Sequence, residues 1–367
     1  MSSIVSFQYI EQHCDSLQAG MTTFYDFIIL KKIMEKFISI IIPIYNGGST
    51  IGKCLEAALA SRYGKYEIVV VDDCSSDDSV EIIKQFPCKL IRLDKRSGAA
   101  AARNRGAENS KGEVLFFLDA DCLIREGALT LANKAIAEHT STIIGGTYTP
   151  LPHDSDFFSA FQSLFIHYSE TRKKEPDYLA THAMIIEASV FRANNGFREE
   201  FMPILEDVEF SHRLRRRGIH LVMKPDIQVM HVFNFTLLRS LRNAFRKSMY
   251  WTLYSLMNRD LLADSGTASV ELKFNGVTFF LNILLLALFL LRGETYLLIP
   301  VPFLCAINLL CSRGLISTFY LEKGYGFTVR AVLYYTMVYP FPVGAGAVAG
   351  FLKHTLIRGR KRVTISL

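Results

Sequence analysis

Strand-like and helix-like segments alternate along this chain from residue 38 to residue 138, and this alternation constrains the fold more than any other feature. Short β-branched or apolar runs predict strands at 38–43, 66–71, 89–93 and 112–118. Helical spacing or alanine-rich composition predicts helices at 49–59, 79–85, 99–108 and 126–138. Strands and helices in this order favour an α/β domain with a doubly wound, mostly parallel sheet.

Acidic residues follow two of these predicted strands directly. Asp72-Asp73 closes the second strand, and Asp119-Ala120-Asp121 follows the buried run at 112–118. Ligands of doubly wound sheets bind beyond the carboxyl ends of the strands, so we expect these acids in one crevice with the loop at 43–46. An uncompensated carboxylate there is costly, and a divalent cation such as Mg²⁺ or Mn²⁺ would compensate it. The alternative is a solvated turn after the strand.

Residues 140–230 interrupt the alternation. Glycines and prolines predict loops at 145–152 and 194–203, with a strand at 183–186 between them. Acids open the segment 206–218, arginines close it and a glycine ends it, which predicts a helix whose dipole is complemented at both ends. The dipole accounts for the arginines, but it leaves the ordered Glu206-Asp207 pair beside a glycine-containing loop unexplained.

Composition separates a globular part from an apolar part. Hydrophobic residues make up 50% of the chain, and the excess lies in 274–352, which is almost free of acids. The net charge is +6, and much of the basic excess lies in 239–259 and 353–362. That distribution suits anionic lipid headgroups better than a nucleic acid, for which no reading motif is visible. The scattered cysteines lack CxxC or zinc-ligand spacing and predict reduced thiols.

The apolar part predicts segments in contact with a membrane. Runs at about 274–291 and 295–312 predict a hairpin of two short spans, and a third segment at 331–352 contains Pro340 and Pro342. A full third span would export the basic tail at 353–367, against the positive-inside rule. We therefore expect the third segment to be kinked and interfacial or re-entrant, and the tail to be cytoplasmic. The Gly346-x-x-x-Gly350 spacing permits close helix packing.

Two further segments complete the predicted organisation. Residues 233–265 combine basic and apolar positions in a pattern typical of amphipathic interfacial helices. The alternative is a helix that packs on the globular domain. Residues 1–36 form a leader for which three hypotheses stay open, namely a peripheral helix, a disordered arm and a start assigned too early.

Several motifs occur together in a fixed order, and together they span about half of the chain. They lie at 40–46, 67–77, 98–106, 112–121, 196–197 and 206–218. In this combination the chain resembles the family 2 glycosyltransferases of the GT-A fold, of the membrane-anchored bacterial and archaeal type. The resemblance implies a catalytic domain at 37–232 with the nucleotide-diphospho-sugar transferase architecture.

The resemblance also implies a role for individual residues. Asp121 and His231 would ligate a divalent cation, Asp207 would be the general base, and Glu206 would lie beside it. The nucleotide-sugar contacts would come from Pro43, Tyr45, Asp73, Arg103 and Asp119. Asp119 would contact the ribose or a metal-bound water. The alternative for His231 is a strand histidine satisfied by the protein.

The function implied is a metal-dependent, inverting transfer of a sugar from a nucleotide-diphosphate sugar to a membrane-associated acceptor at the cytoplasmic face. The acceptor would be a lipid-linked saccharide or a cell-envelope polysaccharide precursor. Two alternatives stay open: a polyprenyl-phosphate sugar synthase resembling dolichyl-phosphate mannose synthase, and a non-catalytic membrane scaffold. The chain departs from many relatives at Lys95-Arg96, and it lacks the Gln-x-x-Arg-Trp motif of processive synthases.

Overall fold

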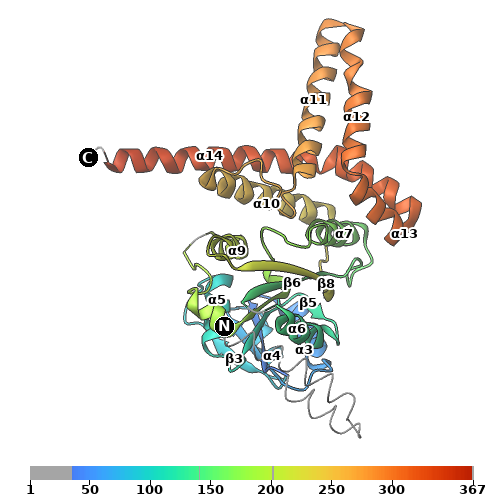
Figure 1. The fold of residues 1–367 in the computed structure, drawn as a ribbon. Coiled ribbons are helices and arrows are strands. Elements are labelled where there is room, and N and C mark those ends of the chain that lie inside the picture. Colours follow the sequence, from blue (N-terminus) through green and yellow to red (C-terminus); the bar gives the residue numbers. More distant parts are fainter. Residues whose placement is uncertain (1–34, 140, 201, 366–367) are drawn as a thin grey trace.

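The computed structural model describes residues 35–139, 141–200 and 202–365, so nearly all of the predicted leader at 1–36 lies outside the described residues. From residue 38 onward the chain forms a sheet flanked by helices. A layer of long helices lies against one side of this domain, and a helical hairpin projects from that layer (Figure 1).

The sheet has eight strands in the order β3-β2-β1-β4-β7-β6-β8-β5. Their bounds are β1 Ile38–Ile44, β2 Tyr66–Asp72, β3 Lys89–Arg92, β4 Val114–Phe117, β5 Cys122–Ile124, β6 Thr142–Tyr148, β7 Met184–Glu187 and β8 His220–His231. Strands β3, β2, β1 and β4 are parallel, as the alternation with helices predicted. Strand β7 is antiparallel to both of its neighbours, and β5 is antiparallel to β8, so the second half of the sheet is mixed.

Helices lie in the connections between the strands and make up most of the described chain after the sheet. In the sheet domain they are α3 Gly48–Leu59, α4 Ser79–Ile83, α5 Ala99–Glu108, α6 Ala128–Glu138, α7 Phe157–Thr171, α8 Ala188–Ala193 and α9 Glu206–Arg216. Beyond the sheet they are α10 Leu237–Asn258, α11 Val270–Arg292, α12 Pro300–Cys311, α13 Arg313–Leu333 and α14 Pro340–Ile365. A π-helical turn, Tyr334–Val338, joins the last two helices.

Strand β1 lies in the middle of the parallel half, and its side chains are buried on both faces. Ile40 and Ile42 belong to one apolar cluster, whereas Ile41 belongs to the cluster on the opposite face of the sheet. Continuous apolar runs are typical of strands covered by helices on both sides, which explains why these strands were predictable. The described cysteines are free thiols, as their spacing predicted.

The predicted loop at 145–152 is wrong in its first half, because Gly145 and Gly146 lie inside β6. A Cβ at Gly145 would overlap the side chain of Leu179, and one at Gly146 would overlap the backbone carbonyl of Ile227. The two glycines therefore permit close packing against the neighbouring segments, and they do not mark a turn. Tertiary contacts, which the local sequence does not show, decide this element.

The apolar part forms the predicted hairpin, from α11 and α12. By length and composition, two stretches of the described chain are long and apolar enough to cross a membrane: Val270–Arg292 and Arg313–Ile357. The segment Thr295–Cys311, where the second span was expected, is a shorter apolar helix. Helix α13 is broken at Gly324, which has a φ of 73°. Helix α14 runs across the base of the hairpin (Figure 1).

Helix α14 lies alongside α10, and two glycines make this approach possible. A Cβ at Gly346 would overlap the carbonyl oxygen of Phe245, and one at Gly350 would overlap that of Met249. The Gly346-x-x-x-Gly350 spacing therefore packs one helix against another, as predicted. Helix α10 also contacts the sheet domain, since Trp251 lies 5.4 Å from the ring of Tyr178. Helix α10 is thus held between the sheet domain and α14.

Candidate active site

The carboxyl ends of β1, β2 and β4 open into one cavity of about 610 Å³. All the residues that the sequence predicted as nucleotide-sugar contacts line it, together with Asp121: Pro43, Tyr45, Asp73, Arg103 and Asp119. We call this space the donor cavity. Its position is that of ligand sites in doubly wound sheets, because parallel strands bring their carboxyl ends to one edge.

Asp73 shapes one wall of the donor cavity. Its carboxylate accepts hydrogen bonds from the backbone N–H groups of Ser97 at 2.6 Å and Gly98 at 2.8 Å. Gly98 has a φ of 91°, which a glycine tolerates at little cost, and α5 begins at the next residue. Asp73 therefore fixes the loop that leads into α5, in addition to facing the cavity.

Tyr45 is the exposed wall of the same cavity, with 40% of its surface accessible. The guanidinium carbon of Arg96 lies 3.9 Å from the centroid of its ring, which is a cation–π contact. One of the two unusual charges at Lys95-Arg96 is thus held at the rim of the donor cavity.

Arg103 connects the two acidic motifs of the chain. Its Nη2 donates to Asp119 at 2.7 Å and its Nη1 donates to Glu206 at 2.6 Å, while the arginine is only 4% exposed. Burial opposes the charge, but the two carboxylates outweigh burial and raise the pKa of Arg103. In return, despite burial, the guanidinium holds the pKa of Asp119 below its usual value. The sequence had predicted that Arg103 lies near the base or diphosphate, and the structure adds these two ion pairs.

A second cavity, of about 280 Å³, shares Arg103 and Asp119 with the donor cavity. We call it the central cavity. Glu206 and Asp207 line it at the start of α9, directly after Leu205, whose φ of 76° is uncommon for a leucine. Burial, and then the neighbouring charge of Glu206, raise the pKa of Asp207 to about 7. The predicted acid pair therefore faces a space next to the donor cavity.

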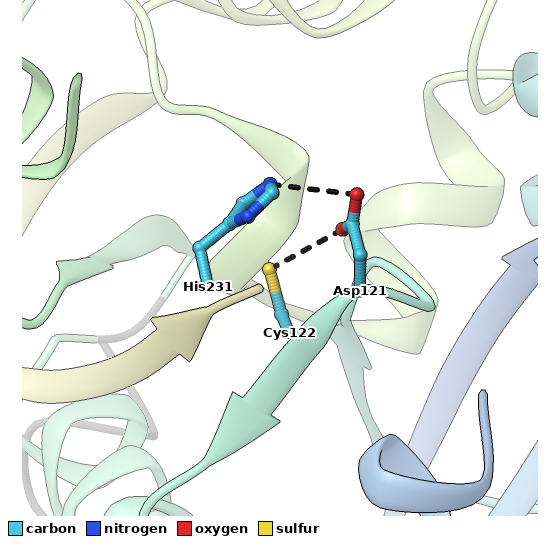
Figure 2. A group of neighbouring side chains, drawn as sticks. All are labelled: Asp121, Cys122 and His231. Atoms are coloured by element: carbon cyan, nitrogen blue, oxygen red, sulfur yellow. Dashed lines mark hydrogen bonds and ion pairs between the residues drawn. The ribbon is translucent and has the colours of Figure 1, made fainter. Parts of the chain in front are cut away.

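Asp121, which lines the donor cavity, lies beside His231, as Figure 2 shows. The Nε2 atom of His231 is 3.4 Å from Oδ2 of Asp121, and the ligand atoms of Asp121, Cys122 and His231 all lie within 4.8 Å of one another. Strand pairing causes this proximity, because β5 and β8 place Cys122 opposite His231. A side-chain exposure of 44% leaves Asp121 open to a ligand.

These atoms fit a divalent cation. A carboxylate and a neutral imidazole are common ligands of such ions. Burial lowers the pKa of His231, which keeps the ring neutral, and its Nδ1 atom is buried without a hydrogen-bond partner among the described residues. Burial raises the pKa of Cys122 well above its usual value, so this residue stays a thiol. The structure thus brings together the two residues that the sequence predicted as ligands, and binding of a cation by Asp121 and His231 stays a prediction.

The sequence analysis missed polar residues on the far side of the central cavity. His182 stacks on Tyr148 with ring centroids 4.0 Å apart, and its Nε2 lies 3.4 Å from Oε2 of Glu170. Burial opposes the charge of His182, but Glu170, together with Asp119 and Asp207, outweighs burial and raises the pKa of His182. Arg246 and Lys247 reach the same cavity from α10. No local pattern marks His182 or Glu170, whereas Arg246 and Lys247 were predicted only as basic positions of an interfacial helix.

Comparison with known proteins agrees with this architecture. Residues 39–194 match the family model described as glycosyl transferase family 2. The glycosyltransferase AglE of Haloferax volcanii is 39% identical over 117 residues, which cover 30% of this chain and 38% of the relative. The glycosyltransferase GlyG of Streptococcus pneumoniae is 32% identical over 131 residues, which cover 34% of this chain and 44% of the relative. The chain thus spans less than half of the length of either relative.

A solved structure resembles the whole architecture. The mannosyltransferase PcManGT from Pyrobaculum calidifontis, in complex with GDP-Man and Mn²⁺, aligns over 88% of this chain and 87% of its own, with a TM-score of 0.54 and 17% identity. At this identity the likeness concerns the fold. The sheet and its strand-end cavity define a GT-A fold, the class that the sequence predicted. The domain that contains residues 39–194 belongs to glycosyl transferase family 2.

Proposed function

We propose that this protein is a metal-dependent, inverting glycosyltransferase that moves a sugar from a nucleotide-diphosphate sugar to a membrane-associated acceptor. One observation carries the proposal. Two pairs of acids face adjoining cavities: Asp119 with Asp121, and Glu206 with Asp207. The ion pairs of Arg103 with Asp119 and Glu206 join the two pairs. A site that breaks a sugar–diphosphate bond and also deprotonates an attacking hydroxyl needs such a pair of acid groups.

The donor cavity would hold the nucleotide sugar. Tyr45 and the backbone around Pro43 would flank the base, and Asp73 would accept a hydrogen bond from it. Asp119 would contact the ribose, and Asp121 and His231 would hold the cation. A bound divalent cation would neutralise the charge that develops on the leaving diphosphate. Arg103, already paired with two carboxylates, would keep Asp119 ionised and correctly placed.

The acceptor would enter the central cavity, on the opposite side of the sugar. Asp207 would take the proton of the attacking hydroxyl as the new bond to the anomeric carbon forms. The bond from that carbon to the diphosphate breaks at the same time, and its electron pair leaves with the nucleoside diphosphate. One in-line displacement of this kind inverts the anomeric centre. General-base assistance typically contributes about 10²–10⁴-fold to the rate.

The membrane-associated location is part of the proposal. Helices α11 and α12 would form a hairpin inserted in the bilayer, α10 and α14 would lie at the headgroups, and the sheet domain with the basic tail would face the cytoplasm. The support is that Leu290, Phe303 and Leu310 on the hairpin are exposed apolar residues. The family model ends at residue 194, before the hairpin, so the proposed membrane role is carried by these side chains and by hydropathy.

One observation favours the polyprenyl-phosphate sugar synthase as a second candidate. Arg246 and Lys247 line the central cavity, where a hydroxyl acceptor needs no cations but a phosphate acceptor would be attracted to them. A phosphate oxygen is already ionised and needs little help from a base. In that case Asp207→Asn would reduce turnover far less than Asp121→Asn, whereas a hydroxyl acceptor predicts large losses for both variants.

Donor binding to the detergent-purified protein tests the proposal. A panel of nucleotide sugars is titrated with and without Mn²⁺, using the wild type and Asp121→Asn. We expect one donor to bind in a metal-dependent way and to be lost in the variant. The exposed Asp226→Asn variant, outside both cavities, is the matched control and should bind like the wild type. Absence of binding by every donor in the wild type would overturn the proposal and favour a non-catalytic scaffold.

A further inference from the structure

An apolar groove of about 700 Å³ lies where α10, α11 and α14 meet. Phe280 on α11 and Val343, Val348 and Phe351 on α14 line it. Several of these side chains are open to the outside, since Phe280 is 42% exposed, Val348 61% and Phe351 53%. The groove therefore borders α11, the most apolar of the long helices.

The inner end of the groove meets the central cavity. Lys247, Trp251 and Thr267 line both spaces. Arg246 and Asp119 in turn line both the central and the donor cavity. The three spaces thus adjoin in the order donor cavity, central cavity and apolar groove. A molecule with a hydrocarbon chain in the groove would present its polar end next to Asp207.

Lys247 marks the border between the apolar groove and the catalytic acids. Its ammonium group has no carboxylate within ion-pair distance among the residues that the structure describes. Burial lowers the pKa of Lys247, although the charges of Glu170 and Asp207 act in the opposite direction. A partly buried cation without a direct partner gains from an anion placed against it. Arg246, on the neighbouring position of α10, adds a second positive charge.

We propose that the groove binds the hydrocarbon chain of a polyprenyl-type lipid phosphate, and that Lys247 holds the phosphate at the entrance to the central cavity. This inference rests on the proposed glycosyl transfer and assigns the binding site for the lipid-phosphate part of its acceptor. Charge complementarity selects the occupant, because a neutral lipid would leave Lys247 unpaired.

Gly276 provides a way to block the groove. It lies on α11 and lines the groove, and a Cβ added there would meet no atom within 4 Å. A leucine at this position would project into the space meant for the chain without disturbing its surroundings. Gly326 on α13 is the matched control, since a Cβ there also meets nothing within 4 Å and the residue does not line the groove.

The experiment measures binding of farnesyl phosphate to the full chain in detergent. Trp251, the single tryptophan of the protein, lies at the border of the two spaces and reports binding by fluorescence. Calorimetry provides a second readout for variants close to this tryptophan. Farnesol and inorganic phosphate serve as the chain-only and phosphate-only probes. The variants are Lys247→Met and Gly276→Leu, with the exposed Lys84→Met and Gly326→Leu as controls.

We expect farnesyl phosphate to bind more tightly than either partial probe, and both variants to weaken it by about tenfold or more while the controls do not. Equal affinity in the wild type and both variants would overturn the inference. Equally tight binding of inorganic phosphate would also overturn it, because the hydrocarbon chain of the lipid would then contribute nothing to the affinity. Equally tight binding of phosphatidic acid in bicelles would overturn it too, because the groove would then not select a polyprenyl-type lipid.

Donor binding separates this inference from the proposed function. Nucleotide-sugar titrations with Mn²⁺ are run on the same preparations. If Lys247→Met and Gly276→Leu bind the donor normally and bind farnesyl phosphate as the wild type does, the groove assignment fails and the transferase proposal stands. If no donor binds to the wild type while farnesyl phosphate shows the expected pattern, the transferase proposal fails and the lipid-phosphate site stands.

Discussion

At the scale of single residues, Arg103 is the centre of the site. It is nearly fully buried and is the only contact by which Asp119, after β4, is tied to Glu206, at the start of α9, among the ion pairs of the described residues. A buried charge whose partner is removed costs far more than an exposed one. Both stability and geometry of the site therefore depend on this side chain.

Replacing Arg103 with Met should destabilise the protein by about 3–5 kcal/mol, because the buried Glu206 and the partly exposed Asp119 lose their buried counter-charge. The free energy of unfolding of the detergent-solubilised protein measures this loss. Arg105→Met is the control, since Arg105 is exposed and pairs only with Glu108 on the same helix. That variant should change stability by less than about 0.5 kcal/mol. Equal effects of the two variants would contradict the structural importance of the buried pairs.

The pH dependence of transfer should report Asp207. Its pKa is raised to about 7 by burial and by Glu206, and the ionised form is the one that can accept a proton. The value of kcat/KM should therefore fall as the pH drops through about 7 and reach a plateau above it. The measurement is a pH profile of the wild type beside Asp207→Asn, which should be slow and flat across the same range. A profile that is unchanged in the variant would remove Asp207 from the role of base.

At the scale of elements, the contact between α10 and α14 is the best-defined one outside the sheet. Gly346 and Gly350 bring the two helix backbones close together. Packing against α14 therefore holds α10 in place, including its side chains that face the sheet domain. The alternative that a helix at 233–265 packs on the globular domain is supported by the contact of Trp251 with Tyr178. Contact of the same helix with a membrane surface stays a prediction.

Gly346→Leu should lower stability by about 1–3 kcal/mol, because the added side chain has no space between α14 and the backbone of Phe245. The midpoint of thermal unfolding in detergent measures the change. Gly326→Leu adds the same side chain to a helix where nothing lies within 4 Å, and it should leave the midpoint almost unchanged. Similar losses of stability in the two variants would indicate a general effect of leucine in these helices. They would contradict a specific close contact at Gly346.

At the scale of the whole molecule, the chain is layered. The sheet domain, the layer of α10 and α14 and the α11–α12 hairpin follow one another along one direction (Figure 1). The donor cavity, the central cavity and the apolar groove follow the same order, from the sheet to the hairpin. A water-soluble donor and a lipid acceptor would thus reach the site from opposite ends.

The turn of the hairpin should lie on the opposite side of a membrane from the sheet domain. Single cysteines replace Glu294 in the turn and Arg259 after α10, in a background where all seven native cysteines are replaced by serine or alanine. A membrane-impermeant maleimide should label the two positions from opposite faces of vesicles with known orientation. Labelling of both positions from the same face would contradict the hairpin span and favour a hairpin that lies on the surface.

The sequence by itself determined the parallel half of the sheet and the acids at its strand ends. Local patterns suffice there, because buried strands are continuous apolar runs and the carboxyl ends of parallel strands meet at one edge. It also indicated Asp207 and His231 as candidate site residues, because the motifs that resemble the family occur in a fixed order and spacing.

Only the tertiary structure decided which residues meet across long separations. The pairing of β5 with β8 places His231 beside Asp121, and the Arg103 ion pairs join α5 to α9. Gly145 and Gly146 belong to a strand because Leu179 and Ile227 press against them, a contact that the local sequence does not contain. The same holds for Lys247, which lines both the central cavity and the apolar groove because of how α10 packs on the domain. Each of these depends on packing between distant segments, whereas local propensity describes only neighbours along the chain.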